Sequence, residues 1–199
     1  NSTPYPGTEL YEIAKREGIL AFRGSLENVS SRFYETGKYY GLDHFVRITG
    51  DAILCDEVMI DKAVESHLHN CCDVTFMRNM PFGTNKEIVS MNAIKVILDT
   101  ALIPSNTEYL EYYLENDRYF SINYAEADYE FDPNLRITLD YEEDLELFRR
   151  IFEHFNKVKP AFTLRDTLAW LKEHPEVASI NMHKRQKHQN NELNVQLNI

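Results

Sequence analysis

The pattern of apolar and polar positions predicts a chain in which helices and strands alternate. Apolar residues recur at helical spacing in the segments 8–16, 91–99, 107–115, 142–155 and 163–173. Short apolar or alternating runs predict strands at 19–22, 44–48, 73–77, 119–124 and 135–139. Frequent alternation of the two kinds of element predicts a layered α/β fold with a mainly parallel sheet.

Capping residues place the ends of several helices. Ser25 is expected to cap a helix that runs to residue 40, with Asn28 as the alternative cap, and Gly41 is expected to stop it. Asp56 is expected to cap a helix that runs to residue 68. The final stretch, 193–199, alternates apolar and polar residues, so it is read as an edge strand, a partner-contact arm or a frayed tail.

Composition narrows the class of protein. The 199 residues suit one domain, with 43% hydrophobic and 27% charged residues. The net charge of −11 and a single basic cluster, HKRQKH at 183–188, argue against a nucleic-acid partner. No apolar run approaches the roughly 20 residues of a membrane span, and the start shows no signal-peptide pattern. Three cysteines without metal-type spacing are expected as reduced thiols in the cytoplasm.

Two predicted strands end in an aspartate. Asp51 follows the run FVRITG, and Asp140 follows LRITL. Ligands of open α/β sheets bind beyond the carboxyl ends of the strands. Two carboxylates there suit Mg²⁺, which one or two carboxylates typically hold together with substrate oxygens and waters. The pair therefore indicates transfer chemistry on a phosphate, where Mg²⁺ neutralises the developing charge.

Each acid also has a purely structural interpretation. Asp51 follows a glycine, so its role could be limited to shaping a turn or capping a helix. Asp140 could cap the helix that starts near residue 142, with Glu143 completing a capping box. The sequence alone leaves both interpretations open.

Three segments, in order, carry a resemblance to a known family. They are FRGS at 22–25 with Val29 and Arg32 after it, VRITGDAILCD at 46–56, and LRITLDYEEDLEL at 135–147. Together they resemble the spore-coat-polysaccharide-type cytidylyltransferases, which are similar to the enzymes that activate acidic sugars. Order and spacing agree from about residue 10 to residue 181.

The resemblance implies a fold, a reaction and a set of site residues. The implied fold is a three-layer α/β/α Rossmann-like fold of the nucleotide-diphospho-sugar transferase type. The implied reaction joins CTP to an acidic sugar, releases pyrophosphate, requires Mg²⁺ and serves surface polysaccharide synthesis. Asp51 and Asp140 would be the catalytic metal ligands. The implied substrate-binding residues are Arg23, Gly24, Ser25, Arg32, Arg47, Gly50, Glu87 and Arg136.

Some of these roles carry an alternative. Arg47 and Arg136 lie on the strands before the two aspartates, and each would either orient a carboxylate, reach a phosphate or form an ordinary ion pair. Glu87 follows a Gly-bearing loop and is expected to contact a sugar hydroxyl. His67 and His69 are expected at the surface, and Trp170 in a core or interface.

The resemblance also defines what to expect of the chain as a whole. Residues 1–181 would form the nucleotidyltransferase-like domain, and residues 182–199 a C-terminal arm or tail. Nothing resembles the family's N-terminal strand and Gly/Arg/Lys loop, which would hold the β- and γ-phosphates, so the domain is expected to be N-terminally incomplete. The C-terminal arm and the related enzymes suggest a homodimer.

Two other functions remain open at this point. A glycosyltransferase that binds a nucleotide-sugar would use the same fold, but no Asp-x-Asp motif occurs beside Asp51. A non-catalytic interaction domain would keep the fold without the phosphate-binding loop. The expected partners of the enzyme are a nucleoside triphosphate, with CTP favoured, and a sugar.

Overall fold

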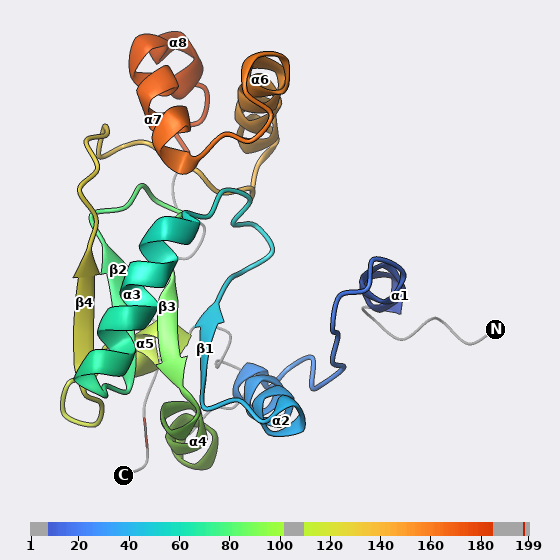
Figure 1. The fold of residues 1–199 in the computed structure, drawn as a ribbon, viewed down its shortest axis with the longest axis vertical. Coiled ribbons are helices and arrows are strands. Elements are labelled where there is room, and N and C mark those ends of the chain that lie inside the picture. The colour runs from blue at the N-terminus through green and yellow to red at the C-terminus, as the bar shows by residue number, and fades with distance from the viewer. Residues whose placement is uncertain (1–7, 102–109, 185–196, 198–199) are drawn as a thin grey trace.

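A four-stranded sheet forms the centre of the protein (Figure 1). The computed structural model describes residues 8–101, 110–184 and 197. The strand order is β1-β3-β2-β4. The strands are β1 (His44–Arg47), β2 (Val74–Arg78), β3 (Glu87–Ser90) and β4 (Ile122–Glu126).

The strand directions explain why the sheet is mixed. Strands β1, β2 and β4 run the same way, as the expected parallel sheet requires, and β2 pairs with β4 directly. Strand β3, which the apolar pattern did not predict, runs in the opposite direction between β1 and β2. The carboxyl ends of β1, β2 and β4 therefore share one edge of the sheet, the upper edge in Figure 1.

Helices cover both faces of the sheet and complete three layers. Helix α3 (Glu57–Asn70) lies on one face (Figure 1). Helices α4 (Met91–Thr100) and α5 (Leu110–Leu114) pack on the other, and α2 (Val29–Tyr40) packs against α4. This arrangement confirms the expected three-layer α/β/α fold.

Alternation along the strands divides the core in two. Met77 and Ile88 join the cluster under α3, whereas Val74 and Val89 join the cluster under α4 and α5. This is the period of two that a strand imposes on its side chains. The first cluster extends beyond the upper sheet edge to helices α6 (Glu142–Val158), α7 (Leu164–Glu173) and α8 (Pro175–Ala178).

Two predicted strands are wrong. Residues 19–22 form no strand, because they join α1 to α2 without a pairing partner among the described residues. Residues 135–139 make a single parallel bridge, between Arg136 and Phe82, so this segment borders the sheet without extending it. The apolar character that suggested a strand at 135–139 comes from burial, since Leu135 and Ile137 belong to the first core cluster.

Two predicted caps are also corrected. Asn28, not Ser25, caps α2, accepting a 2.8 Å hydrogen bond from the backbone of Ser31. At α6 the N-cap residue is Tyr141, and the acid at its third position is Asp144 rather than Glu143. The caps Asp56 and Gly41 lie where the sequence predicted them.

His67 is buried, contrary to the surface position expected for it. Its ring nitrogens lie 3.0 Å from His44 Nδ1 and 2.9 Å from Thr75 Oγ1, and Cys72 Sγ lies 3.3 Å from it. Burial, reinforced by the His44 charge, lowers the pKa of His67 to about 4. The spacing of His67 and His69 correctly predicted that they lie on different faces of the helix. His67 faces the core, and His69 is exposed.

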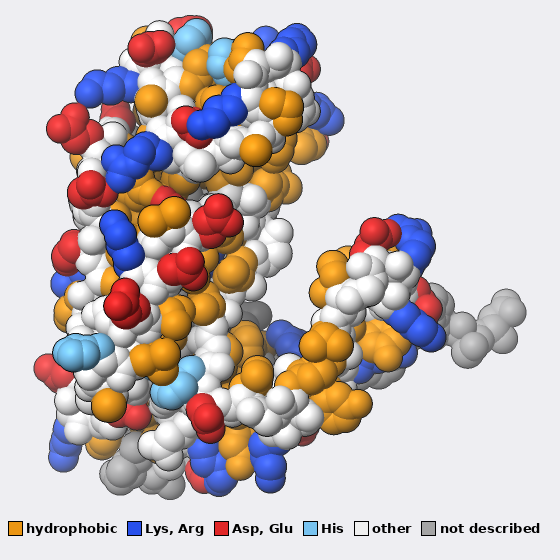
Figure 2. Space-filling view, viewed as in Figure 1, with side chains coloured by type: hydrophobic (Ala, Val, Ile, Leu, Met, Phe, Trp, Pro, Cys, Tyr) orange, Lys and Arg blue, Asp and Glu red, His pale blue; other side chains and the backbone are white. Residues whose placement is uncertain are grey.

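The helix α1 (Thr8–Arg16) forms an arm with the connection that follows it. No residue of α1 is buried, and Leu10, Ile13, Ile19 and Leu20 are exposed apolar side chains. Figure 2 shows the arm standing away from the body, with an open hollow between them.

The remaining sequence expectations fall partly outside the described residues. Trp170 packs against the first core cluster, as predicted. Of the stretch 193–199 only Leu197 is described, and it bridges to Ala101. In the described ranges all three cysteines are free, and no helix there is long and apolar enough to cross a membrane.

Candidate active site

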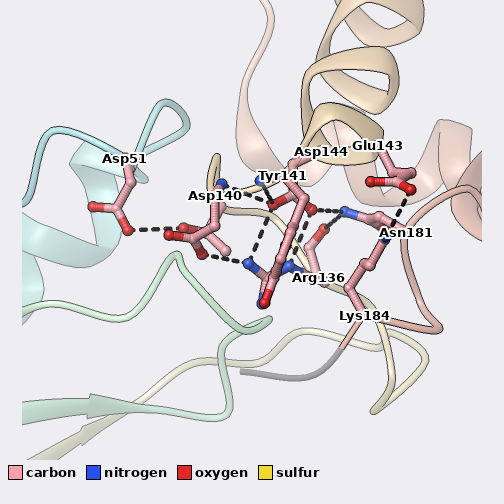
Figure 3. A network of polar contacts seen from close by, with 9 residues as sticks. Asp51, Arg136, Asp140, Tyr141, Glu143, Asp144, Asn181 and Lys184 are labelled. Atoms are coloured by element: carbon pink, nitrogen blue, oxygen red, sulfur yellow. Dashed lines mark hydrogen bonds and ion pairs between the residues drawn. The ribbon is translucent and has the colours of Figure 1, made fainter. Parts of the chain in front are cut away.

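Asp51 and Asp140 lie beside one another beyond the upper edge of the sheet (Figure 3). Asp51 is in the loop after β1, and the segment that ends in Asp140 runs alongside that loop. The backbone N–H of Leu139 donates to the carbonyl oxygen of Asp51 over 3.1 Å. The Thr138 hydroxyl donates to Asp51 Oδ2 over 2.9 Å. The two strand-end acids of the sequence are therefore brought to one place.

Asp51 is held in its ionised form. Burial alone would raise its pKa, but hydrogen bonds from Thr49 and Thr138 and the charge of Lys86 outweigh burial and lower the pKa below 3.8. Gly50 beside it is exposed, and a side chain there would meet nothing within 4 Å. The loop thus presents a charged carboxylate from an open turn.

Arg136 connects Asp140 to the buried interior. Its Nη2 forms an ion pair with Asp140 Oδ2, and its Nε and Nη2 donate to the two oxygens of Asp144 over 3.0 and 3.2 Å. The side chains of Arg136 and Asp144 are 4% and 0% exposed, whereas that of Asp140 is 29% exposed. Arg136 is therefore an ion-pairing residue that orients Asp140, which was one of its predicted roles.

Asp144 is the centre of this buried network, and the sequence interpretation missed it. It accepts from the backbone N–H groups of Asp140 and Tyr141 over 2.8 and 3.0 Å and from Asn181 Nδ2 over 2.8 Å. Burial alone would raise the pKa of Asp144, but these donors and Arg136 hold it below 3.8. The capping-box pattern at the start of α6 was the signal for this residue, but the sequence pattern indicated Glu143 as the acid of that box, one position too early.

An outer ion pair borders the network. Lys184 Nζ lies 2.6 Å from Glu143 Oε1 and 5.3 Å from the centre of the Tyr141 ring (Figure 3). Met182 packs against the first core cluster. The start of the predicted C-terminal arm thus contacts the candidate site.

Arg47 and Glu87 form a separate cluster on the sheet. They are register partners on β1 and β3, with Arg47 Nη1 3.4 Å from Glu87 Oε1 and 3.2 Å from Glu111 Oε2 of α5. Burial, together with the nearby Glu111 charge, raises the pKa of Glu87 against the opposing effect of Arg47. Arg47 therefore forms ion pairs with two glutamates rather than with Asp51, which agrees with the ordinary ion pair that the sequence left open for it.

Arg23, Gly24, Ser25 and Arg32 gather at the base of the arm. Arg32 Nη1 donates to the carbonyl oxygen of Ser25 over 2.9 Å, and a Cβ on Gly24 would lie 2.9 Å from Arg32 Cγ. Arg23 lies over the Tyr11 ring, 4.1 Å from its centre. These contacts join the group to α1 and α2. The sequence-predicted residues therefore occupy three clusters.

The donor set of the site suits a hard divalent cation with ligands from a substrate. Two carboxylates meet at Asp51 and Asp140, and oxygen ligands of this kind match Mg²⁺. Within the described part of the chain, no three His, Cys, Asp or Glu side chains group closely enough to hold a metal by themselves. Asp51 and Asp140 are the residues that would hold such a cation, together with oxygen atoms of a substrate.

A three-layer α/β/α fold with two acids side by side beyond one edge of its sheet is typical of the nucleotidyltransferases. The family model for cytidylyltransferases matches residues 9–193. The chain belongs to the cytidylyltransferase family.

Known proteins agree with this assignment. An uncharacterised protein of Methanocaldococcus jannaschii is 31% identical over 89% of this chain and 73% of its own length. The spore coat polysaccharide biosynthesis protein SpsF of Bacillus subtilis is 26% identical over 82% of this chain and 69% of its own. The structure of a cytidylyltransferase from Leptospira borgpetersenii is similar with a TM-score of 0.80 and 25% identity. The similarity covers 94% of this chain and 79% of the Leptospira chain.

Proposed function

We propose that the protein is a Mg²⁺-dependent cytidylyltransferase that joins CTP to an acidic sugar. The observation that carries the proposal is the meeting of Asp51 and Asp140, which the hydrogen bonds from Thr138 and Leu139 to Asp51 hold together. Membership of the cytidylyltransferase family supports the choice of nucleotide. The similarity to the spore coat protein SpsF supports a place in polysaccharide synthesis.

Asp51 and Asp140 would hold the Mg²⁺ ion by one or two carboxylate oxygens, leaving its other positions to phosphates and waters. When bound, the ion neutralises the charge that develops on the phosphate oxygens. Asp51 is suited to this role because its pKa lies below 3.8, so the carboxylate is charged at neutral pH. Arg136 would fix the direction of Asp140 through their ion pair.

The reaction needs alignment more than a dedicated proton acceptor. A sugar hydroxyl oxygen attacks the α-phosphorus, the bond from that phosphorus to the bridging oxygen breaks, and pyrophosphate leaves. The hydroxyl proton passes to solvent. Holding the attacking and leaving oxygens in line can supply much of the rate. The rigid network under Asp140 provides such fixed positioning.

Other residues would bind substrate. Glu87 would accept a hydrogen bond from a sugar hydroxyl, with Arg47 setting its direction. Arg23 and Arg32, with the backbone at Gly24 and Ser25, would contact the nucleotide or the sugar. Gly50 would leave room for a phosphate beside Asp51.

Pyrophosphate release tests this function. The full-length protein is incubated with Mg²⁺, each of CTP, UTP, ATP and GTP, and a panel of acidic and neutral sugars. We expect release with CTP and an acidic sugar, and a loss of at least about 100-fold in Asp51→Asn and Asp140→Asn. Asp61→Asn, an exposed acid on α3, is the matched control and is expected to retain activity.

Two outcomes would refute the proposal. Near-normal turnover in either site variant would remove the two acids from the chemistry. A protein that binds no nucleotide in the presence of Mg²⁺ and releases no pyrophosphate with any pair would instead be a binding domain that retains the fold.

A further inference from the structure

Lys86 is a buried cation close to the candidate site, and neither the sequence motifs nor the proposed chemistry uses it. The residue is 3% exposed and precedes Glu87 on β3. Its Nζ donates to the carbonyl oxygens of Gly83 and Asn85 over 3.0 and 2.8 Å. A buried ammonium group is costly unless its charge and its donors are satisfied. Its position therefore calls for a structural or functional reason.

The two carbonyl groups belong to a loop, 81–86, that presses on the segment carrying Asp140. Ile137 N–H donates to the carbonyl oxygen of Phe82 over 2.8 Å, and Phe82 bridges in parallel to Arg136. A Cβ on Gly83 would lie 2.4 Å from the Ile137 carbonyl oxygen and 2.6 Å from Thr138 Cβ. The loop thus touches 136–138 along its length, and only glycine fits at its closest approach.

Thr138 and Leu139 continue from this contact to Asp51, through the hydroxyl and backbone hydrogen bonds already described. Lys86 ties the end of the loop to its middle, because its ammonium group donates to the carbonyl oxygen of Gly83. Gly83 is also the residue that packs against Ile137 and Thr138. The charges of Lys86 and Asp51 also act on one another, each favouring the ionised form of the other.

We propose that Lys86 is a positioning residue of the active site, whose buried ammonium group fixes the loop 81–86 in the shape that packs against the segment carrying Asp140, to which Asp51 is hydrogen-bonded. The inference that this bracing serves catalysis depends on the proposed function. The bracing itself is a statement about structure and is tested without activity. Lys86 would act through Gly83 and Thr138 and would touch no substrate.

Backbone hydrogen exchange in Lys86→Met tests the brace. Methionine keeps the length of the buried stem and removes the charge and the donors. We expect the amides of Ile137 and Leu139 to exchange at least about tenfold faster, as the loss of hydrogen bonds from a charged donor implies. The amide of Ile97 in α4, on the opposite face of the sheet, is expected to change much less. Lys172→Met, at an exposed lysine, is the matched control.

Kinetics of the same variant test the catalytic consequence. We expect Lys86→Met to lower kcat by about tenfold or more while the KM for CTP changes little, because the alignment of the acids matters most in the transition state. If Lys86→Met does not fold, Lys86→Gln, which keeps one donor without the charge, is expected to show the same local exchange effect at smaller size.

The outcomes separate the two proposals. Unchanged exchange at Ile137 and Leu139, or equal acceleration throughout the molecule, overturns the brace. Local acceleration in a protein whose wild type releases no pyrophosphate leaves the brace standing and removes the proposed function. Local acceleration with unchanged kcat overturns the link between the brace and catalysis.

Discussion

The amide of Leu139 and the carbonyl oxygen of Asp51 are joined by a 3.1 Å hydrogen bond, between segments far apart in the sequence. The neighbouring Thr138 hydroxyl binds the Asp51 side chain. Backbone and carboxylate of Asp51 are therefore both attached to the segment that ends in Asp140. The spacing of the two acids depends on how firmly this segment is held.

Removing the Thr138 hydroxyl is expected to impair the site without unfolding the protein. Thr138→Val keeps the shape of this buried side chain but removes one of the hydrogen-bond donors to Asp51, which raises the Asp51 pKa. A hydrogen bond to a charged group is worth about 1.5–3 kcal/mol, so kcat/KM is expected to fall about 10- to 100-fold. Steady-state pyrophosphate release measures the loss, and Thr138→Ser, which keeps the hydroxyl, should retain most activity.

Asp144→Asn is expected to destabilise the fold. The substitution leaves Arg136 buried without its main counter-charge, and breaking a buried pair in this way costs about 3–5 kcal/mol. Urea denaturation followed by circular dichroism measures the free energy of unfolding. Glu143→Gln, next to it but in a partly exposed ion pair with Lys184, is the control and should unfold at nearly the wild-type midpoint. Equal midpoints for the two variants would contradict the role given to Asp144.

His67 is expected to make stability fall as the solution becomes acidic. Its pKa is about 4 in the folded protein and about 6.5 when unfolded, so the unfolded chain binds the proton more tightly. The stabilisation is complete above pH 6.5 and is lost as the pH falls towards 4, by a total on the order of 3 kcal/mol. His44, Asp73 and Cys72 face the same ring.

Denaturation midpoints between pH 7 and pH 4 measure this effect. The slope in that window is expected to be smaller in His67→Gln than in the wild type. His69→Gln, on the same helix but exposed, should keep the wild-type slope. A wild-type histidine signal that titrates near pH 6.5 at His67 would contradict the burial argument.

Nucleotide with Mg²⁺ is expected to stabilise the folded protein through Asp51. A ligand at 100 times its dissociation constant adds about 2.7 kcal/mol to the free energy of unfolding. We therefore expect CTP with Mg²⁺ to raise the melting temperature of the wild type, and EDTA to reverse most of the rise. The Asp51→Asn variant should show little shift under the same conditions, whereas Asp61→Asn should shift as the wild type does.

The sequence predicted the fold well where periodicity and caps were strong. The helix after Asp56 and the α/β layers are as expected because local pattern and tertiary packing agree there. Residues 135–139 were misread because a fully buried segment is apolar whether or not it pairs as a strand. Strand β3 was missed because its four residues, all buried, follow a turn-rich stretch that reads as a loop.

The two acids could be predicted from sequence, but their supports could not. Asp51 and Asp140 each end an apolar run, which is a local signal. Asp144 and Asn181 meet around Arg136 only after α6 to α8 pack over the sheet edge. Lys86 carries no local signal at all, since its role depends on a loop folding back onto its own ammonium group.

Arg136 forms ion pairs with both Asp140 and Asp144. The Asp140 side chain is partly exposed, whereas the Asp144 side chain is wholly buried. A single nucleotide substitution that turns Asp140 into Asn would leave Arg136 bound to Asp144, and Asp144 bound to Asn181. A lineage could thus lose the chemistry proposed here in one mutational step and inherit the architecture intact. In genomes, relatives that keep Arg136, Asp144 and Asn181 should be judged for activity by the residue at position 140.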